Sequence, residues 1–324
     1  MQVEVKTIGV LTSGGDAPGM NAAVRAVVRT AITMGYKVKG IHHGYNGLLT
    51  GEIEEMNMRS VSEIIHRGGT MLYTARCLEF VTPEGQKKAA DACRQNGIDA
   101  LVVIGGDGSF RGCRDMVKQG IPCVGIPGTI DNDIACSDYT IGYDTAMNTA
   151  VEMIDKLRDT TQSHDRCSVV EVMGRNAGYI AFNTGIAVGA LVTLIPEVPY
   201  DLQRDVIDKM KKTQKEGKQH FIVIIAEGVG HAGDLANEIQ SATGIDSRAT
   251  VLGHVQRGGS PTLRDRVTAS RMGYHAVNLI NRGIFNRVVA TKAESIVDYD
   301  IDVALSMHKT IDTSLLDVSA AISI

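Results

Sequence analysis

Short apolar, β-branched runs alternate along this chain with longer segments of helical periodicity. The runs cover residues 8–11, 100–104, 123–126, 168–172 and 221–225. Such runs suit strands that are buried on both faces of a parallel sheet. In the intervening segment 20–31, apolar residues recur at helical spacing and would form one stripe on a helix. This alternation predicts a doubly wound α/β protein with largely parallel sheets.

Length and composition narrow the possibilities further. The chain has 324 residues, of which 44% are hydrophobic, so two domains are expected. A net charge of −4 offers no broad basic field for nucleic acid or an anionic membrane, which favours small-molecule partners. Six widely spaced cysteines indicate reduced thiols, and no apolar run approaches the roughly 20 residues that span a bilayer. We therefore expect a cytoplasmic protein that binds neither nucleic acid nor membrane.

Several of the predicted strands run directly into glycine-rich turns, at residues 13–16, 105–109 and 174–178. In open α/β sheets, ligands bind beyond the carboxyl ends of the strands. The first two turns leave free N–H groups just before a helix, which favours phosphate. Each turn alone is equally compatible with a tight turn, and neither matches the P-loop or the dinucleotide-binding motif. Two such turns together indicate a polyphosphate ligand.

Carboxylates follow two of the predicted strands. Asp107, set among glycines, is placed to reach a metal ion that bridges phosphate oxygens, but an aspartate here also suits a helix N-cap. The segment 127–133 presents Asp131 and Asp133 together with an amide and a hydroxyl. Phosphoryl transfer needs a base for the attacking hydroxyl, and an aspartate of ordinary pKa, about 3.9, is ionised at neutral pH. The alternative for this segment is a cluster of Asx-turns.

Arginines stand beside glycines or polar turns at several places along the chain. They are Arg76, Arg166, Arg175, Arg248 and Arg257. A planar guanidinium matches phosphate oxygens, although most arginines are simply solvated surface charges. Glu227, after the apolar run 221–226, is suited to accept hydrogen bonds from sugar hydroxyls or to cap the following segment. These residues favour a phosphorylated sugar as the second ligand.

Several motifs, in this order, resemble the bacterial 6-phosphofructokinase family. They cover residues 11–21, 105–109, 127–133, 172–175 and 253–260, and the likeness thins after about residue 290. The resemblance implies the phosphofructokinase fold, with two similar doubly wound, Rossmann-like domains. An ATP-binding domain would comprise residues 1–138 and about 251–301. A sugar-phosphate-binding domain would comprise 139–250 and about 302–324.

The resemblance also implies transfer of the γ-phosphoryl of ATP to the 1-hydroxyl of fructose 6-phosphate in glycolysis, with Mg²⁺, by a homotetramer. Asp131 would be the base, and the other catalytic positions are Thr129, Arg76, Arg175 and Gly15. The family's ATP positions are matched by Gly15, Arg76, Cys77, Gly106, Asp107, Gly108 and Ser109, with Asp107 at the Mg²⁺ position. The sugar-phosphate positions are matched by Thr129, Ile130, Asp131, Arg166, Met173, Gly174, Arg175, Glu227, Arg248, His254, Val255, Gln256 and Arg257. Of these, Arg166 and Arg248 would arrive from a neighbouring subunit.

Two glycines bear on the phosphoryl donor. Pyrophosphate-using relatives typically carry Asp at the position of Gly108 and Lys at that of Gly128. A carboxylate at 108 would occupy and repel the space needed by the α-phosphate of ATP, so both glycines favour ATP over a pyrophosphate-dependent phosphofructokinase. Two more distant alternatives are a non-catalytic sugar-phosphate sensor and a nicotinamide dehydrogenase. The intact charged residues disfavour the sensor, and the missing glycine motif disfavours the dehydrogenase.

The effector positions depart from the family pattern. Bacterial members that respond to ADP and phosphoenolpyruvate use arginines matching Arg25, Arg29 and Arg158, and Lys218 is a further candidate. Where those members place a glutamate, a basic residue and a lysine, this chain has Leu191, Met58 and Glu216. Weak or altered regulation is therefore expected. Tyr179 is a second departure, since relatives usually carry Asp there.

Overall fold

The computed structural model describes residues 4–323 as two compact units. Unit 1 comprises the chain up to Ile130, then Ile134–Thr145 and Arg257–Lys309. Unit 2 comprises Asp131–Asp133, Ala146–Gln256 and the chain from Thr310 onward. The chain therefore passes between the units several times, and each unit is assembled from segments that are distant in sequence.

Unit 1 is built on a seven-stranded sheet in the order β11-β10-β5-β4-β1-β2-β3. The strands are β1 (Thr7–Ser13), β2 (Lys37–Ile41), β3 (Ile53–Met56), β4 (Ala100–Gly105), β5 (Cys123–Pro127), β10 (Arg287–Lys292) and β11 (Ser295–Asp300). The central strands run parallel, and the edge strands β3 and β11 are antiparallel. Every residue of β1, β4 and β5 is buried, as continuous apolar runs predict.

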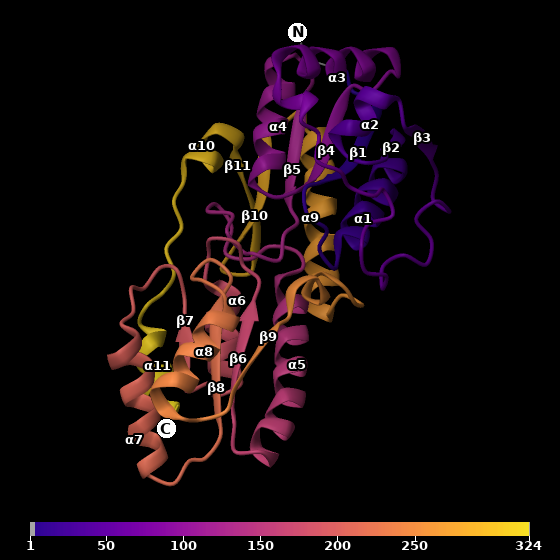
Figure 1. The fold of residues 1–324 in the computed structure, drawn as a ribbon. Coiled ribbons are helices and arrows are strands. Elements are labelled where there is room, and N and C mark those ends of the chain that lie inside the picture. Colours follow the sequence, from indigo (N-terminus) through magenta and orange to yellow (C-terminus); the bar gives the residue numbers. More distant parts are fainter. Residues whose placement is uncertain (1–3, 324) are drawn as a thin grey trace. The chain divides into compact units, whose positions relative to one another are not determined.

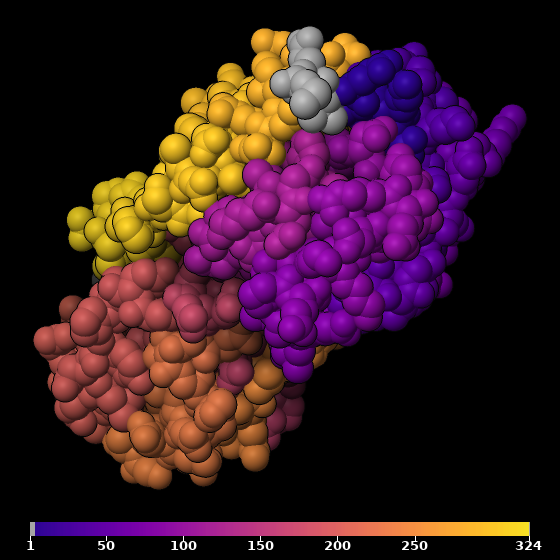
Figure 2. Space-filling model, turned by 90° about the horizontal axis from the view of Figure 1, so that it is seen from above, coloured from indigo at the N-terminus to yellow at the C-terminus, as the bar shows by residue number. Residues whose placement is uncertain are grey.

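Helices cover both faces of this sheet. On one face α1 (Met20–Thr33) packs along α9 (Leu263–Asn281), as Figure 1 shows, and the approach is close enough that a Cβ at Gly273 would lie 2.7 Å from the Cβ of Ala26. The other face carries α2 (Tyr45–Thr50), α3 (Pro83–Gln95), α4 (Asp107–Lys118) and α10 (Ile301–Ser306). Figure 2 shows the yellow of α10 beside the purple of α4, in keeping with the place of Arg257–Lys309 in this unit.

Unit 2 is built on a four-stranded parallel sheet in the order β7-β8-β6-β9. The strands are β6 (Cys167–Val172), β7 (Val192–Leu194), β8 (Phe221–Ala226) and β9 (Ser247–Val251). Its helices are α5 (Tyr143–Ser163, mostly in this unit), α6 (Tyr179–Ala187), a π-helical turn Leu202–Ile207 leading into α7 (Asp208–Lys215), α8 (Ala232–Thr243) and α11 (Leu315–Ile322). Two largely parallel sheets covered by helices confirm the predicted α/β class.

The sequence patterns located the three middle strands of unit 1 and the two middle strands of unit 2, but not the strands that flank them. The runs predicted at 8–11, 100–104, 123–126, 168–172 and 221–225 lie in β1, β4, β5, β6 and β8. Six strands were not predicted: β2, β3, β7, β9, β10 and β11. β3, β9 and β11 are partly exposed and lack a continuous apolar run, β7 has only three residues, and charged residues flank or interrupt the apolar positions of β2 and β10. Across residues 4–323, the structure contains no helix long and apolar enough to cross a membrane.

Candidate active site

Three polar loops of unit 1 meet at the carboxyl ends of adjacent strands. β1, β4 and β5 are neighbours, and their register sets Ser13 opposite Gly105 and Gly105 opposite Pro127. The hydroxyl of Ser109 donates to the carbonyl of Ser13 at 3.1 Å. The N–H of Gly128 donates to the carbonyl of Gly105 at 2.9 Å. The loops that begin at residues 14 and 128 and the start of α4 after Gly106 are therefore adjacent, as expected for a ligand site in an open α/β sheet.

The glycines of these loops leave room for ligand or for a neighbouring side chain. No heavy atom lies within 4 Å of where a Cβ at Gly108 would stand, so this position in the first turn of α4 faces open space. A Cβ at Gly15 would lie 2.5 Å from Nη1 of Arg257, which instead donates to the carbonyl of Asp16 at 2.9 Å. Arg257 is thereby held against the first glycine loop, where its positive charge favours an anion.

The loop that carries Arg76 and Cys77 is tied to the end of β1. The hydroxyl of Thr12 donates to the carbonyl of Tyr73 at 2.7 Å, and the hydroxyl of Thr74 donates to the carbonyl of Gly14 at 2.6 Å. These bonds hold residues 73 and 74 beside the end of β1 and the first glycine loop. The predicted ATP position Arg76 follows two residues later, and its side chain is exposed. Cys77 is half-buried and packs against the apolar core.

Asp107 is the first residue of α4, not its cap. The N-cap is Gly106, and no side chain caps this helix, so the capping interpretation of Asp107 is wrong. Its Oδ2 accepts from Nε of Arg111 at 2.9 Å, and both side chains are exposed. Within residues 4–323, no group of three or more His, Cys, Asp or Glu side chains is arranged to hold a metal. Because Mg²⁺ is commonly held by one or two carboxylates plus substrate phosphates, a lone Asp107 beside a phosphate loop fits that donor set.

The segment from Thr129 to Asp131 leaves β5 at the same edge. The N–H of Thr129 donates to the carbonyl of Ile141 at 3.1 Å, and the carbonyl of Thr129 accepts from the hydroxyl of Thr140 at 2.7 Å. Ile130 is fully buried and Asp131 is 7% exposed. A carboxylate placed at a strand end with little contact with bulk water is suited to act on a bound hydroxyl.

Unit 2 brings Met173, Gly174 and Arg175 together with two acidic or amide side chains. Oε1 of Glu227 accepts from the N–H groups of Gly174 (3.1 Å) and Arg175 (2.5 Å). Oε1 of the fully buried Gln256 accepts from the N–H of Met173 at 2.9 Å. Arg175 has the left-handed φ of 58°, which these bonds hold in place. This positioning role of Glu227 and Gln256 was missed, since nothing in a sequence shows which backbone groups a distant side chain will meet.

His254 and Val255 lie in the short 3₁₀ turn Gly253–Arg257 that follows β9, and both side chains are exposed. Because β6 and β9 are parallel neighbours, this turn and the 173–175 turn share one edge of the unit 2 sheet. The predicted sugar-phosphate positions Met173 to Arg175, Glu227 and His254 to Gln256 therefore converge within unit 2.

Arg166 and Arg248 lie at the opposite edge of the unit 2 sheet. Both pair with Asp246, Arg166 through Nε to Oδ2 at 2.6 Å and Arg248 through Nε to Oδ1 at 3.1 Å. Arg166 precedes β6 while Met173 follows it, and the six residues of this strand span roughly 20 Å. The two arginines are thus brought together with each other, but not with the other sugar-phosphate positions of the same unit.

Comparisons with known proteins agree with this geometry. The family model described as phosphofructokinase matches residues 7–280. The chain belongs to the phosphofructokinase family. The resemblance inferred from the sequence is thereby confirmed.

This phosphofructokinase-family chain is 55% identical to each of two relatives named ATP-dependent 6-phosphofructokinase. They come from Bacillus thuringiensis (strain Al Hakam) and Bacillus cereus (strain AH187). The match covers 99% of this chain and 100% of theirs. A solved phosphofructokinase from Saccharomyces cerevisiae matches with a TM-score of 0.87 at 35% identity, covering 98% of this chain and 48% of the yeast chain. A pyrophosphate-dependent phosphofructokinase from Marinobacter aquaeolei matches with a TM-score of 0.86 at 21% identity, covering 98% of this chain and 88% of that one, which shows the shared fold alone.

The predicted effector positions of this phosphofructokinase-family member fall in both units. Arg25 and Arg29 lie on α1, where burial, and next the charge of Arg29, lowers the pKa of Arg25. In unit 2, Arg158 donates to the carbonyl of Val188. Burial, and then the charge of Arg158, lowers the pKa of Lys218, so these two cations are close together.

The three residues that depart from the family's effector pattern have different environments. Leu191 is 1% exposed and belongs to the apolar core of unit 2. Met58 is 37% exposed, and Glu216 ends α7 as its C-cap. A buried leucine is not available to a bound ligand in this arrangement.

Tyr179 begins α6 next to two carboxylates. Burial raises the pKa of Tyr179 to about 12, and the charges of Glu197 and Asp133 act in the same direction. An aspartate at this position would add a third carboxylate to the same neighbourhood. The tyrosine therefore avoids like-charge repulsion that the usual family residue would meet in this chain.

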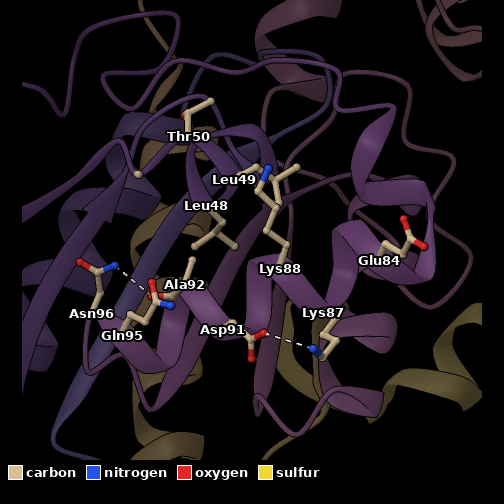
Figure 3. Close-up of a pocket in the computed structure, with 11 residues that line it drawn as sticks. Leu48, Leu49, Thr50, Glu84, Lys87, Lys88, Asp91, Ala92, Gln95 and Asn96 are labelled. Atoms are coloured by element: carbon tan, nitrogen blue, oxygen red, sulfur yellow. Dashed lines mark hydrogen bonds and ion pairs between the residues drawn. The ribbon is translucent and has the colours of Figure 1, made fainter.

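A surface hollow between α2 and α3 holds none of these residues (Figure 3). Its lining includes Lys87 and Lys88, which pair with Asp91 at 3.8 Å and with Glu79 at 3.0 Å. Because the lysines are already matched by carboxylates, the hollow offers no net charge to a phosphate. The glycine loops remain the candidate active site.

Proposed function

We propose that this protein transfers the γ-phosphoryl group of ATP to the 1-hydroxyl of fructose 6-phosphate, giving fructose 1,6-bisphosphate and ADP. The observation that carries the proposal is the meeting of two glycine loops and the Thr129–Asp131 segment at the ends of three adjacent strands. Full-length identity of 55% to proteins named ATP-dependent 6-phosphofructokinase supports the same substrates. Unit 1 would hold ATP, and the convergent turns of unit 2 would hold the sugar phosphate.

Asp131 accepts the proton of the attacking 1-hydroxyl in this mechanism. The new bond joins that oxygen to the γ-phosphorus, and the bond between the γ-phosphorus and the bridging oxygen breaks, so that ADP leaves with the electron pair. Arg76 and Arg175 supply positive charge beside the transferring group, and Thr129 helps to position the sugar. When bound, Mg²⁺ offsets charge on the phosphate oxygens, with Asp107 as its protein ligand.

The two glycines that distinguish this chain from pyrophosphate-using relatives lie in different surroundings. At Gly108 the surrounding space is open, so glycine leaves room for an α-phosphate. At Gly128 a Cβ would lie 3.0 Å from Cγ2 of Ile104 and 3.1 Å from Cε of Met20, so a lysine there would disturb the packing of unit 1. Gly108 is therefore the position that bears directly on the donor.

Replacing Asp131 tests the proposed base. Asp131→Ser should lower ADP release from ATP, Mg²⁺ and fructose 6-phosphate by roughly 10²- to 10⁴-fold, the range typical of general base catalysis. The matched control is Asp138→Ser in the following loop, where the exposed carboxylate pairs with Lys292 at 2.7 Å. Equal rates in Asp131→Ser and wild type would contradict the assignment, and absent turnover in wild type would favour a sugar-phosphate sensor.

We also propose a cytoplasmic homotetramer whose active sites are shared between subunits. Arg166 and Arg248 lie a strand length from the other sugar-phosphate positions of their own unit, so they serve a site only if a second chain supplies them. Mixing the inactive variants Asp131→Ser and Arg248→Ala tests this arrangement. Shared sites should restore roughly a quarter of wild-type activity after subunit exchange, because about one site in four would then combine two intact residues. No recovery in verified mixed oligomers would contradict it.

A further inference from the structure

Asp265, in the first turn of α9, is a fully buried carboxylate at the centre of a hydrogen-bond network in unit 1. Its Oδ1 accepts from the hydroxyl of Tyr139 and from the N–H of Gly142 at 2.7 Å. Its Oδ2 accepts from the N–H and the hydroxyl of Thr145, at 2.9 and 2.5 Å. Every one of these donors belongs to residues 139–145, more than a hundred positions away in the sequence.

The position of Asp265 has an ordinary local explanation, which the structure does not support. Thr262 and Asp265 have the spacing of a capping box, in which the acidic side chain would accept from the N–H of Thr262. That N–H donates instead to the hydroxyl oxygen of Thr145 at 3.0 Å. The hydroxyl oxygen of Thr262 does cap α9, accepting from the N–H of Asp265 at 3.3 Å. The carboxylate is therefore directed to the 139–145 loop and not to its own helix.

The 139–145 loop in turn holds the segment that leads to Asp131. Residues 128 and 141 form a parallel bridge, in which the N–H of Ile141 donates to the carbonyl of Pro127 at 3.0 Å. The N–H of Thr129 donates back to the carbonyl of Ile141 at 3.1 Å, and Thr140 donates to the carbonyl of Thr129 at 2.7 Å. The N–H and the carbonyl of Thr129 are thus both fixed by the loop that Asp265 organises.

The same loop packs against the turn that follows the first glycine pair. A Cβ at Gly142, whose φ is 101°, would lie 2.6 Å from the Cβ of Ala17 and 3.3 Å from Cγ2 of Ile130. A Cβ at Gly19 would lie 2.7 Å from Cγ2 of Ile141 and 3.4 Å from the Cβ of Asp265. Little space remains for the loop to shift, so a change at Asp265 is transmitted to the residues on either side of it.

We infer that Asp265 is a positioning residue for phosphoryl transfer: through residues 139–145 it fixes Thr129 and Ile130, and hence the place of Asp131. The inference rests on the proposed role of Asp131 as the base. A carboxylate is required because all of its partners are donors, and an amide would turn an N–H₂ group toward at least one of them. A misplacement of about 1 Å in a reacting group can cost roughly 100-fold in rate, so a network distant from the reacting atoms can still control turnover.

The test is a double-mutant cycle in the full-length protein with ATP, Mg²⁺ and fructose 6-phosphate. Asp265→Asn should lower kcat roughly 10- to 100-fold while KM for ATP stays within about twofold. In the Asp131→Ser background the same change should have little further effect, because the base whose position it controls is already absent. The control is Asp298→Asn, which removes a half-buried carboxylate of unit 1, bonded to His275 and Arg287, and should leave kcat unchanged.

The outcomes separate this inference from the proposed function. Unchanged kcat in Asp265→Asn, or an equal loss in both backgrounds, would overturn the positioning role. If Asp131→Ser retains activity, the assignment of the base is wrong, and the wild-type background alone then decides whether Asp265 affects turnover. If Asp265→Asn does not fold, Tyr139→Phe, which removes one donor, should lower kcat roughly two- to fivefold with ATP KM unchanged, and no change in kcat would overturn the inference.

Discussion

The two sheets differ at the edges where the substrate sites are proposed. In unit 1 the loops after β1 and β4 are rich in glycine, and the backbone at Gly108 faces open space. In unit 2 the turn after β6 has its N–H groups occupied by Glu227 and Gln256. In unit 1 the backbone itself is accessible to a ligand. In unit 2 the backbone of the turn is hydrogen-bonded within the unit, so a ligand would be bound mainly by side chains.

This difference suits the two substrates. Phosphate groups are well bound by free N–H groups at helix starts, so glycine loops would suit ATP in the proposed assignment. A sugar phosphate must be distinguished by the direction of its hydroxyls, which requires side chains held in one geometry. The strained φ of 58° at Arg175 is an example, because Glu227 stabilises a conformation that arginine seldom adopts. Changes at the two edges should therefore affect different substrates.

The largest effect is expected where unit 1 is open. Gly108→Asp should lower kcat/KM for ATP roughly 100-fold or more, because a second carboxylate beside Asp107 repels the phosphates of ATP. The fold should be unaffected, since no heavy atom stands within 4 Å of the new Cβ. Steady-state kinetics with varied ATP, together with thermal unfolding, measure both.

Gly233→Asp provides the control for this change. Gly233 is also the second residue of a helix, α8 of unit 2, and also has nothing within 4 Å of its Cβ position. That variant should keep the wild-type kcat/KM for ATP. Comparable losses in both variants would mean that charge in a first helical turn, and not the site, explains the effect.

A smaller effect, on the other substrate, is expected in unit 2. Glu227→Ala leaves the N–H groups of Gly174 and Arg175 without this acceptor, and two lost hydrogen bonds of about 1 kcal/mol each correspond to roughly 30-fold. We expect that loss in kcat/KM for fructose 6-phosphate, with KM for ATP unchanged. Glu227→Gln should lose less, because its amide oxygen can still accept.

The control for Glu227 is Glu171→Ala on β6. Oε2 of Glu171 accepts from the N–H of Ala232 at 2.9 Å, so this change also removes a backbone acceptor in unit 2. It should lower stability without altering kcat/KM for the sugar phosphate. If Glu227→Ala instead raises KM for ATP, the division of substrates between the two edges is wrong.

The contrast between the units also explains what the sequence could predict. Glycine patterns after apolar runs are local, and they are sufficient to locate the loops of unit 1 and the 173–175 turn. The central strands are equally visible, because burial on both faces leaves a continuous apolar run. Features encoded within about ten neighbouring residues are therefore accessible from sequence.

Contacts between distant segments are not accessible in this way. Gln256 meets Met173 across 83 positions, and Asp265 meets Tyr139 across 126. In the sequence, Asp265 shows only the pattern of a helix start. Asp107 shows the same pattern, but there the capping interpretation is wrong, because Gly106 is the N-cap of α4. Aspartate is common at the start of helices for structural reasons. An aspartate at a predicted helix start therefore says little about function.

A weak effect is expected where unit 2 departs from the family's effector pattern. We expect ADP or phosphoenolpyruvate to shift the half-saturating concentration of fructose 6-phosphate by less than about fivefold, below the usual range of allosteric coupling. Leu191 is in the core and provides no ligand for an effector-bound cation, although Arg158 and Lys218 remain close together. Velocity against fructose 6-phosphate, with and without each effector, measures this. A large shift would show that the two cations suffice.

The smallest effect is expected for Asp298, a carboxylate of unit 1 whose side-chain partners lie on a helix and a strand and not in a loop. Burial opposes the charge of Asp298, but its bonds with His275 and Arg287 together lower the pKa of that carboxyl below the ordinary value of 3.8. A lowered folded pKa contributes stability above the unfolded value, and that contribution is lost as the pH falls through the folded value. Asp298→Asn should therefore lower the free energy of unfolding by about 1 kcal/mol or less at neutral pH, and the difference should shrink below about pH 4.

Denaturant unfolding of wild type and Asp298→Asn, from about pH 7 down to about pH 3, measures that difference. Asp298 and Glu227 each accept from two donors, yet the donors of Asp298 are side chains of α9 and β10, and those of Glu227 are the backbone of a turn. Turnover should accordingly follow Glu227 and not Asp298. A loss of kcat in Asp298→Asn would mean that even a half-buried carboxylate outside the proposed site affects catalysis, and the distinction between stabilising and positioning residues would fail.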